Sequence, residues 1–460
     1  MKKLQVWGWL VSGFIKKHKK IILLGTTLGI VFAIFIIWVL PYIPRPNVAR
    51  RVALVGQYRS SELPHFITSR IGQGLVSILE DGQPAPALAS DWKVSNGGKT
   101  FTFYLRDNLY WQDGTKVTAD TLIYEFQDVE TKIVDEKIIE FTLKSPYTPF
   151  PTLLSKPALK SGFVGTGEYI LRDIEEKSGY VSHLILEGPK ENIIVKFYPN
   201  LKMATTAFAL GEVDEIVNAY KNPYENNSAW EKSITVTQER NFNQYLGLFL
   251  NNSDNLLQDK SFRQALAYAT VKPVDSTRVL GPISTVSWAY NPDLKTYDYD
   301  PSRAQELLKK SIGDLERAKE TTLKLSTTQA FLATAESIKQ NWEETLGLSV
   351  EIQVINTISP DFQILLATQE IPSDPDQYSL WHSTQSQNFI HFKSPRIDKL
   401  LEDGRQEFDQ EKRKELYSDF QRFFVEDCPV IFLSYPETYT IKRNSILDPI
   451  FGILLQLGRD

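Results

Sequence analysis

Cysteine is nearly absent from this chain, because Cys428 is the only one among its 460 residues. The sequence therefore excludes an intramolecular disulfide and a zinc site built on cysteines. No cysteine follows the N-terminal apolar run, so we expect no lipid anchor on a cysteine. Since Cys428 precedes the apolar stretch 430–433, we expect a small buried side chain rather than a reactive thiol.

Residues and motifs typical of catalysis are also scarce. The chain has five histidines and contains neither a G-x-S-x-G nor an H-E-x-x-H motif. Its formal net charge of −5 provides no basic patch of the kind that binds nucleic acid. We therefore predict that the protein is not an enzyme, that it needs no cofactor, and that it has no nucleic-acid partner.

Charge is missing altogether from Ile21–Leu40, which follows the basic run Lys16–Lys20. Twenty residues of helix span about 30 Å, the thickness of the bilayer's hydrocarbon core. The positive-inside rule then predicts a cytoplasmic segment at 1–20, a transmembrane anchor at 21–42, and an extracytoplasmic remainder. The alternative is a signal peptide that is removed, although no small-residue cleavage site of the A-x-A kind is present.

Beyond the apolar run, composition and pattern indicate more than one folded domain. The remaining chain exceeds the roughly 250–300 residues of a single domain. Aromatic residues make up 12% and hydrophobic residues 42%, enough for packed cores. Helix-like and strand-like segments alternate irregularly, which favours mixed α/β domains.

Individual elements follow from turn signals and apolar periodicity. Asn96–Gly98 predicts a turn between strands at 92–95 and 100–105. Thr118 looks like the N-cap of a helix from Ala119 to about Asp128. Further strands are expected at 138–143, 245–250, 323–325 and 350–355, and further helices at 261–270, 302–310, 333–346 and 410–425.

The most specific feature is a series of short motifs between Pro86 and Asp120. They read PALASDW, NGGKT, TFYLR, WQDGT and TAD, in that order. In this order and spacing they resemble the family 5 extracellular solute-binding proteins, the peptide- and nickel-binding receptors of ATP-driven importers. Similar stretches occur at 165–169, 209–214, 262–269, 299–308, 375–378 and 427–433, so the resemblance covers about Val52–Phe451.

The resemblance implies a two-lobed α/β clamshell of the type II periplasmic-binding-protein kind. We expect one lobe from 50–243 together with 430–460, and the other from 244–429. Ligand would bind between the lobes, with closure driven by tighter binding to the closed state. Segments 128–138 and 271–286 are shorter than the family pattern, which predicts trimmed surfaces beside the cleft.

The segment Ile371–Gln385 is predicted to touch ligand. Receptors of this family use an aspartate in this region to bind a peptide's amino terminus. The predicted ligand-binding residues are Asp374, Asp376, Tyr378, Trp381 and Ser383. The two aspartates are candidates for the amine, with capping of a local turn as the alternative for each.

The other three side chains have different predicted roles. Tyr378 and Trp381 would wall the pocket, and Ser383 would pair with the ligand's main chain. The alternative for Trp381 is an ordinary core position. His382 and His391 lack supporting cysteines or an acidic cluster, so we predict no metal site.

The sequence therefore favours a monomeric, membrane-anchored receptor that binds peptides and delivers them to an ABC permease in the same membrane. A sensor or adhesion protein with the same clamshell is the alternative. A membrane-anchored hydrolase would need a nucleophile and base, for which no motif is recognisable.

Overall fold

The computed structural model describes residues 17–21, 25–29, 49–160, 163–225, 227, 230, 233–275, 277–313, 319–355 and 361–444. The chain divides into two compact units, residues 1–49 with 190–192, and residues 50–189 with 193–460. In the first unit, the described residues include short helical segments at 17–21 and 25–29. None of the helices within the described ranges combines the length and apolarity needed to span a bilayer. Most of the predicted anchor at 21–42 lies outside those ranges.

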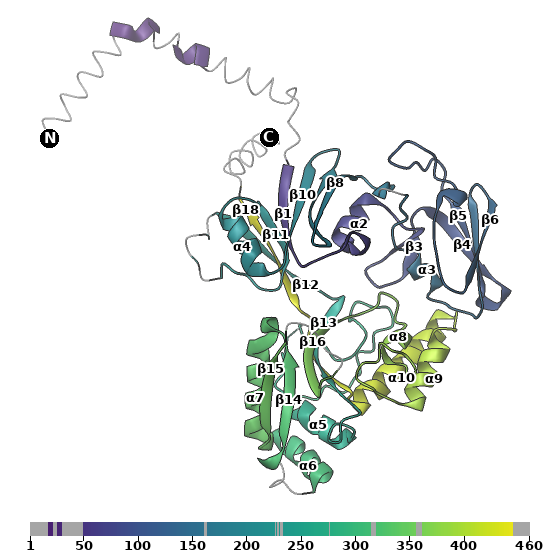
Figure 1. Cartoon of the computed structure of the whole chain (residues 1–460), viewed down its shortest axis with the longest axis vertical. Coiled ribbons are helices and arrows are strands. Elements are labelled where there is room, and N and C mark those ends of the chain that lie inside the picture. The colour runs from purple at the N-terminus through teal and green to yellow at the C-terminus, as the bar shows by residue number, and fades with distance from the viewer. Residues whose placement is uncertain are drawn as a thin grey trace, which may run out of the picture. The chain divides into compact units, whose positions relative to one another are not determined.

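A seven-stranded sheet in the order β12-β18-β11-β1-β10-β9-β8 lies in the upper part of the second unit as drawn in Figure 1. Its strands are β1 Ala49–Val55, β8 Ile170–Lys177, β9 Tyr180–Glu187, β10 Asn192–Tyr198, β11 Glu215–Ala219, β12 Ile234–Arg240 and β18 Glu437–Arg443. Strands β1 and β11 are parallel, whereas β18 runs antiparallel to both β11 and β12. The first and the last described strands, β1 and β18, thus lie on either side of β11 in one sheet.

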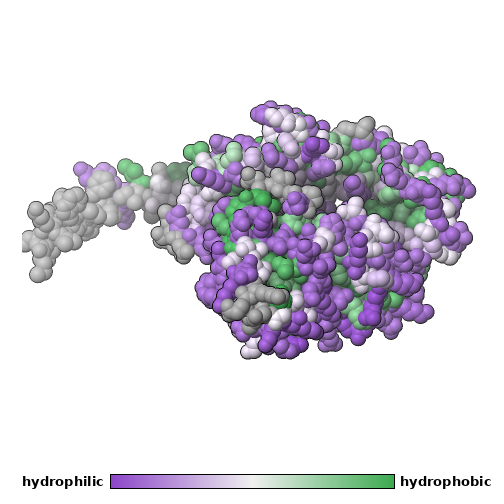
Figure 2. All heavy atoms as spheres, turned by 60° about the horizontal axis from the view of Figure 1, so that its bottom comes forward, coloured by the Kyte–Doolittle hydropathy of each residue, from purple (hydrophilic) through white to green (hydrophobic). Residues whose placement is uncertain are grey.

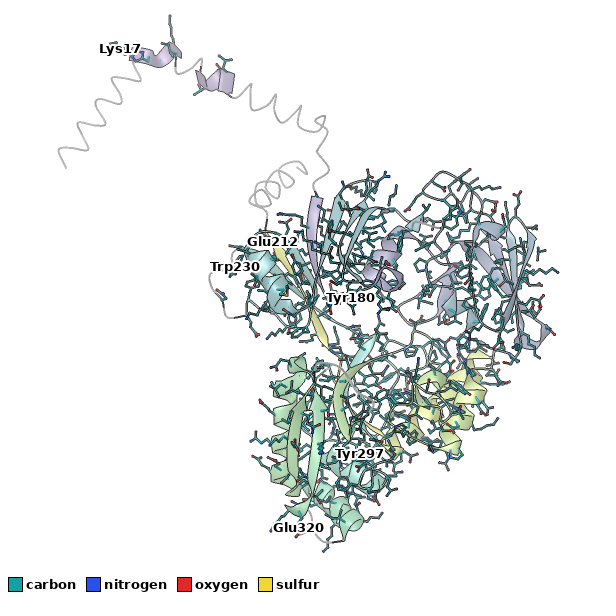
Figure 3. The ribbon with its side chains drawn as sticks, in the orientation of Figure 1. Lys17, Tyr180, Glu212, Trp230, Tyr297 and Glu320 are labelled. Atoms are coloured by element: carbon teal, nitrogen blue, oxygen red, sulfur yellow. The ribbon has the colours of Figure 1, made fainter. Side chains whose placement is uncertain are left out.

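Helices α2 His65–Ile71 and α4 Leu201–Ala209 pack against this sheet. Asn200 begins α4 as a true N-cap, because its side chain accepts a hydrogen bond from the Met203 amide. Trp230 lies beside α4 in Figure 3, with its ring centroid 5.9 Å from that of Phe208. Aromatic packing therefore covers one face of the sheet near β11 and β18.

A four-stranded antiparallel sheet contains most of the motifs between Pro86 and Asp120 that carry the resemblance to the family. Its order is β4-β5-β7-β6, with β4 Ala89–Ser95, β5 Thr100–Leu105, β6 Val129–Asp135 and β7 Ile138–Leu143. The predicted hairpin around 96–98 and the predicted strand at 138–143 are confirmed. Phe101, Phe103 and Phe141 are fully buried and form the core of this sheet with the short helix α3 Phe150–Leu153.

The predicted helix from Ala119 to Asp128 is wrong. A capping box at Thr118 is present, but the helix stops after the single 3₁₀ turn Ala119–Thr121. The alternating side chains of Leu122, Tyr124 and Phe126 then pack on the core around Phe141 in an extended segment. That period-two pattern outweighs the N-terminal helix signal, and the chain continues into β6.

A five-stranded sheet in the order β15-β14-β16-β13-β17 has its own helices. Its strands are β13 Gln244–Leu250, β14 Thr322–Thr327, β15 Ser349–Val354, β16 Ile364–Glu370 and β17 Val430–Ser434. The helices are α5 Lys260–Ala269, α6 Pro301–Ile312, α7 Leu332–Leu346, α8 Tyr378–Trp381, α9 Pro395–Gly404 and α10 Gln410–Asp427. The predicted helices near α5, α6, α7 and α10 are confirmed, and so are the strands near β13, β14 and β15.

Cys428 ends α10 in the left-handed conformation, with φ of 51°. Its side chain is 1% exposed, so the prediction of a buried cysteine is confirmed. Burial raises the pKa of the Cys428 thiol to about 11, which keeps it protonated and unreactive at neutral pH.

We call the part with the seven-, four- and two-stranded sheets the first lobe, and the part with the five-stranded sheet and α5–α10 the second lobe. The chain passes between them twice, from β12 to β13 and from β17 to β18 (Figure 1). The predicted boundaries at 243/244 and 429/430 stay a prediction. Because β17 pairs with β13, sheet membership favours placing the second boundary between Ser434 and Glu437.

Candidate functional site

A cavity of about 760 Å³ lies between the two lobes. Its volume falls within the range of roughly 300–1,000 Å³ that is typical of small-molecule sites. First-lobe residues in its wall are His65, Ser69, 72–74, 76–82, Pro86, Ala87, Arg106, Ser155 and Pro157, and second-lobe residues are Phe242, Asn243, Ser284, 286–287 and 371–373. We call it the interlobe cavity. Hydrophilic residues dominate the face shown in Figure 2, with apolar residues gathered in patches among them.

A small hairpin of the first lobe builds part of this wall. Its strands, β2 Val76–Ile78 and β3 Pro84–Pro86, pair antiparallel, and residues 79–83 form the tip. The Leu79 amide donates to the Gln83 carbonyl at 2.9 Å, which closes the turn. Glu80 and Asp81 are therefore held at the end of a short, hydrogen-bonded arm.

The hairpin tip also contacts the second lobe directly. The Trp288 amide donates to the Asp81 carbonyl at 3.1 Å. Gly82 has φ of +89°, and a Cβ atom at this position would lie 2.1 Å from the Ser373 carbonyl oxygen. Only glycine allows this left-handed turn and this close approach of two backbones.

Three charged side chains of the cavity have no ionic partner in the part of the chain that the structure describes. The Asp81 carboxylate accepts hydrogen bonds from the Gln83 amide at 3.0 Å and from the Gln83 side chain at 2.8 Å. Arg106 donates through Nη2 to the Pro86 carbonyl at 3.1 Å. Among the described residues, no opposite charge lies within 4.0 Å of Glu80, Asp81 or Arg106. Charges of both signs are thus available to a ligand.

Ser284 provides a neutral polar group on the opposite wall. Its side chain is 5% exposed, and its hydroxyl has no hydrogen-bond partner within the described part of the chain. A buried hydroxyl without a partner is unfavourable, so a ligand that pairs with it gains affinity.

The structure places the predicted amine anchor Asp374 in a buried ion pair. Arg413 of α10 donates to both of its carboxylate oxygens, at 2.6 and 2.9 Å, and the Asp374 side chain is 9% exposed. The Asp376 amide also donates to Asp374 at 2.9 Å. The carboxylate is therefore fully engaged by the protein itself.

Asp376 lies beside Asp374 and is equally enclosed. Its carboxylate lies 3.4 Å from Arg405 and accepts a hydrogen bond from the Tyr378 amide at 3.1 Å. Burial raises the pKa of Asp376 above its ordinary value, although the charge of Arg405 opposes this shift. The Arg405 guanidinium stands 4.1 Å above the ring of Tyr378, so this tyrosine is part of the same cluster.

Trp381 and Ser383 are also engaged within the second lobe. Trp381 is 1% exposed and donates to Gln377 at 2.6 Å. Ser383 donates through its hydroxyl to Asp398 at 2.6 Å. None of the five predicted residues belongs to the described wall of the interlobe cavity. Their role in binding stays a prediction.

The wall instead contains the three residues just before Asp374, together with the hairpin tip. Ile371, Pro372 and Ser373 line the cavity, so the predicted segment Ile371–Gln385 reaches it with its first residues only. The sequence analysis missed Glu80, Asp81 and Arg106. The Asp81-Gly82 pair is a turn signal between two short apolar stretches, and it could have indicated the hairpin.

The side chain of His382 makes its contacts within the second lobe. His382 is 5% exposed, with one ring nitrogen 2.8 Å from the Thr384 hydroxyl and the other 3.3 Å from Glu402. No group of three or more histidine, cysteine or acidic side chains suited to a metal ion occurs among the residues that the structure describes.

Comparison with known proteins agrees with this architecture. A probable D,D-dipeptide-binding periplasmic protein, DdpA of Escherichia coli, is 23% identical over 81% of this chain and 84% of its own. The oligopeptide-binding protein AppA of Bacillus subtilis is 24% identical over 78% and 80%. The crystal structure of the substrate-binding protein CtaP from Listeria monocytogenes matches with a TM-score of 0.73, at 19% identity over 86% and 94% of the two chains.

The family model for bacterial extracellular solute-binding proteins, family 5 Middle, matches residues 83–389. This range spans both lobes and begins at Gln83, the last residue of the hairpin tip; it includes Arg106, Ser284 and the segment 371–373. The two-lobed α/β fold and the interlobe cavity are what such a receptor needs. The chain therefore belongs to the bacterial extracellular solute-binding proteins of family 5.

Proposed function

We propose that this protein is a membrane-anchored receptor that binds short peptides in the interlobe cavity and delivers them to an ATP-driven importer. Its family consists of solute-binding receptors and not of enzymes. The observation that carries the peptide proposal is the cavity itself, which both lobes line. Its wall contains a buried hydroxyl and charges of both signs that have no ionic partner among the described residues. A peptide offers two charged ends and main-chain polar groups that suit such a wall.

The names of the relatives support the same class of ligand. DdpA is described as binding D,D-dipeptides and AppA as binding oligopeptides. Another relative, NikZ of Campylobacter jejuni, was solved with nickel and histidine, at 21% identity and a TM-score of 0.69. For this chain we favour peptides, because no cluster of metal-binding side chains occurs in its described residues.

The proposal of an anchor rests on the sequence of the N-terminal segment. Ile21–Leu40 has no charged residue and follows a basic run, as expected for a helix that enters the bilayer from the cytoplasm. Tethering would keep the receptor near its permease at high effective concentration. Release of the intact chain from membranes by salt or alkaline carbonate would contradict this part of the proposal.

Peptide binding is expected to raise the thermal stability of the full-length protein. A ligand at 100 times its dissociation constant adds about 2.7 kcal/mol to the free energy of unfolding. We would measure the melting temperature with pools of peptides, with sugars and with nickel–histidine chelates. A shift with another solute class but with none of the peptide pools would overturn the peptide proposal.

Replacing Gly82 by alanine is expected to weaken ligand binding by tenfold or more. The added methyl group would collide with the Ser373 carbonyl oxygen, 2.1 Å away, and would push the hairpin tip from the second lobe. If the closed arrangement of the two lobes becomes less favourable, the affinity for the ligand falls. Calorimetric titration of the variant with a bound peptide measures the change.

Gly114→Ala is the matched control for this prediction. Gly114 has φ of +81°, so alanine brings similar backbone strain there, but nothing lies within 4 Å of the added Cβ atom. We expect Gly114→Ala to bind peptide like the wild type. Equal losses in both variants would mean that strain, and not the contact between lobes, decides the result.

A further inference from the structure

We propose that the first lobe recognises both charged ends of the ligand, and that the ligand is a peptide of three or four residues. Glu80 and Asp81 would bind its ammonium group, and Arg106 its carboxylate. This inference rests on the proposed function and assigns the residues and the ligand length within the same cavity.

The distribution of charge between the two walls is the first argument. The second-lobe wall consists of Phe242, Asn243, Ser284, residues 286–287 and residues 371–373, and none of these described residues is charged. Asp374 follows this wall directly, but Arg413 already neutralises it. Charged ends of a ligand in this cavity therefore find their opposite charges on the first lobe.

The second argument is that the charged side chains of the first-lobe wall have no opposite charge beside them among the described residues. Glu80 and Asp81 lie together at the hairpin tip, and the described residues place no cation within 4.0 Å of either carboxylate. Within the described ranges, the Asp81 carboxylate accepts hydrogen bonds only from the amide and side chain of Gln83. Two adjacent carboxylates without a cation attract an ammonium group, and unpaired Arg106 attracts a carboxylate.

The hairpin register sets the distance between these two charge sites. Arg106 is held at the Pro86 carbonyl, and Pro86 pairs with Val76 at the base of the hairpin. Glu80 lies four residues beyond Val76, at the tip. At about 3.3 Å per residue, and with the turn shortening the path, the separation is roughly 10–13 Å. An extended peptide spans about 3.3–3.6 Å per residue, so three or four residues fit.

Ser284 is an independent sign of a ligand at this place. Its hydroxyl is buried without a partner, and it belongs to the segment whose Trp288 amide binds the Asp81 carbonyl. The hydroxyl therefore lies on the wall that faces the hairpin. A peptide that runs along the hairpin would present main-chain amide and carbonyl groups to it, which is the pairing that this hydroxyl lacks.

The test is a titration of the full-length protein with random-sequence peptide pools of each length from two to six residues. Peptides with free ends, with an acetylated amino end and with an amidated carboxyl end are compared. We expect the tightest binding at three or four residues, and a loss of at least tenfold when either end is blocked.

Variants assign each end to its side chains. In Glu80→Gln/Asp81→Asn, acetylation of the amino end should have no further effect, whereas amidation should still weaken binding. In Arg106→Gln, amidation of the carboxyl end should have no further effect, whereas acetylation of the amino end should still weaken binding. This is a double-mutant cycle between protein and ligand. Glu130→Gln and Arg59→Gln are the controls, because they remove exposed charges outside the cavity. In both variants, acetylation and amidation of the peptide should weaken binding as much as in the wild type.

The outcomes separate this inference from the proposed function. If peptides bind but end blocking has no effect, or if blocking still weakens binding in the matching variant, the charge assignment is wrong and the peptide receptor remains. If peptides of two, five or six residues bind most tightly, the proposed ligand length of three or four residues is wrong. If no peptide pool binds to the wild type, the proposed function itself fails.

Discussion

Replacing Asp374 by alanine is expected to lower the free energy of unfolding by about 3–5 kcal/mol, because it leaves a buried arginine without its counter-charge. Arg413 is 5% exposed and donates to Asp374 through both terminal nitrogens. Its remaining acceptors, the Gly404 carbonyl at 2.8 Å and the Tyr417 hydroxyl at 3.3 Å, are neutral. Urea unfolding of the full-length protein, followed by tryptophan fluorescence, measures the loss.

Two further variants make this result specific. Asp403→Ala breaks an exposed pair with Lys399, 2.7 Å apart on α9, and should change stability by about 0.5 kcal/mol or less. The double variant Asp374→Leu/Arg413→Met removes both buried charges and should recover most of the stability that Asp374→Ala loses. If Asp374→Ala instead keeps its stability and loses peptide affinity, Asp374 is the amine anchor that the sequence predicted.

The contribution of Lys272 to the free energy of unfolding is expected to rise with pH between about 7 and 10. Its ammonium group is buried and donates to the carbonyl oxygens of Ala267, Thr270 and Tyr297 at 2.5, 3.0 and 2.7 Å. Burial lowers the pKa of Lys272 to about 7, mainly through loss of hydration. In Figure 3, Tyr297 lies inside the second lobe, where this group is enclosed.

The sign follows from proton binding. An unfolded lysine has a pKa of about 10.4, so above pH 7 the unfolded chain binds more protons than the folded one. Stability then increases with pH, by on the order of 3–5 kcal/mol over the whole interval, and shows no slope from this group below pH 7. Above about pH 10, buried tyrosines act in the opposite sense, since burial raises the pKa of Tyr245 and Tyr417.

Comparison of the wild type with Lys272→Met isolates this contribution. The difference in free energy of unfolding between the two proteins should change steadily from pH 7 to pH 10, in favour of the wild type at high pH. For Lys324→Met, at an exposed position of β14, the curve of unfolding free energy against pH should run parallel to that of the wild type. Parallel pH curves for Lys272→Met and the wild type would show that Lys272 keeps an ordinary pKa in the folded protein.

Local elements of the fold could be predicted where neighbouring residues carry the signal. Asn96–Gly98 marks the turn of a hairpin, and Asp300 with Pro301 marks the start of α6. The wrong prediction of a helix at 119–128 also comes from reliance on local signals. The N-cap at Thr118 is real, but the alternating apolar residues after it pack on Phe141, a partner that local pattern does not reveal.

The sequence by itself determined the family and the two-lobed fold, because turn, cap and periodicity signals act over a few residues and recur in a recognisable order. Only the tertiary structure decided what each charge meets. Asp374 has its partner Arg413 39 residues away, whereas Glu80 and Arg106 line a shared cavity with no opposite charge beside them among the described residues. Burial and pairing depend on contacts between distant segments. A sequence can show that a carboxylate exists, but only packing shows whether it faces an arginine or a ligand.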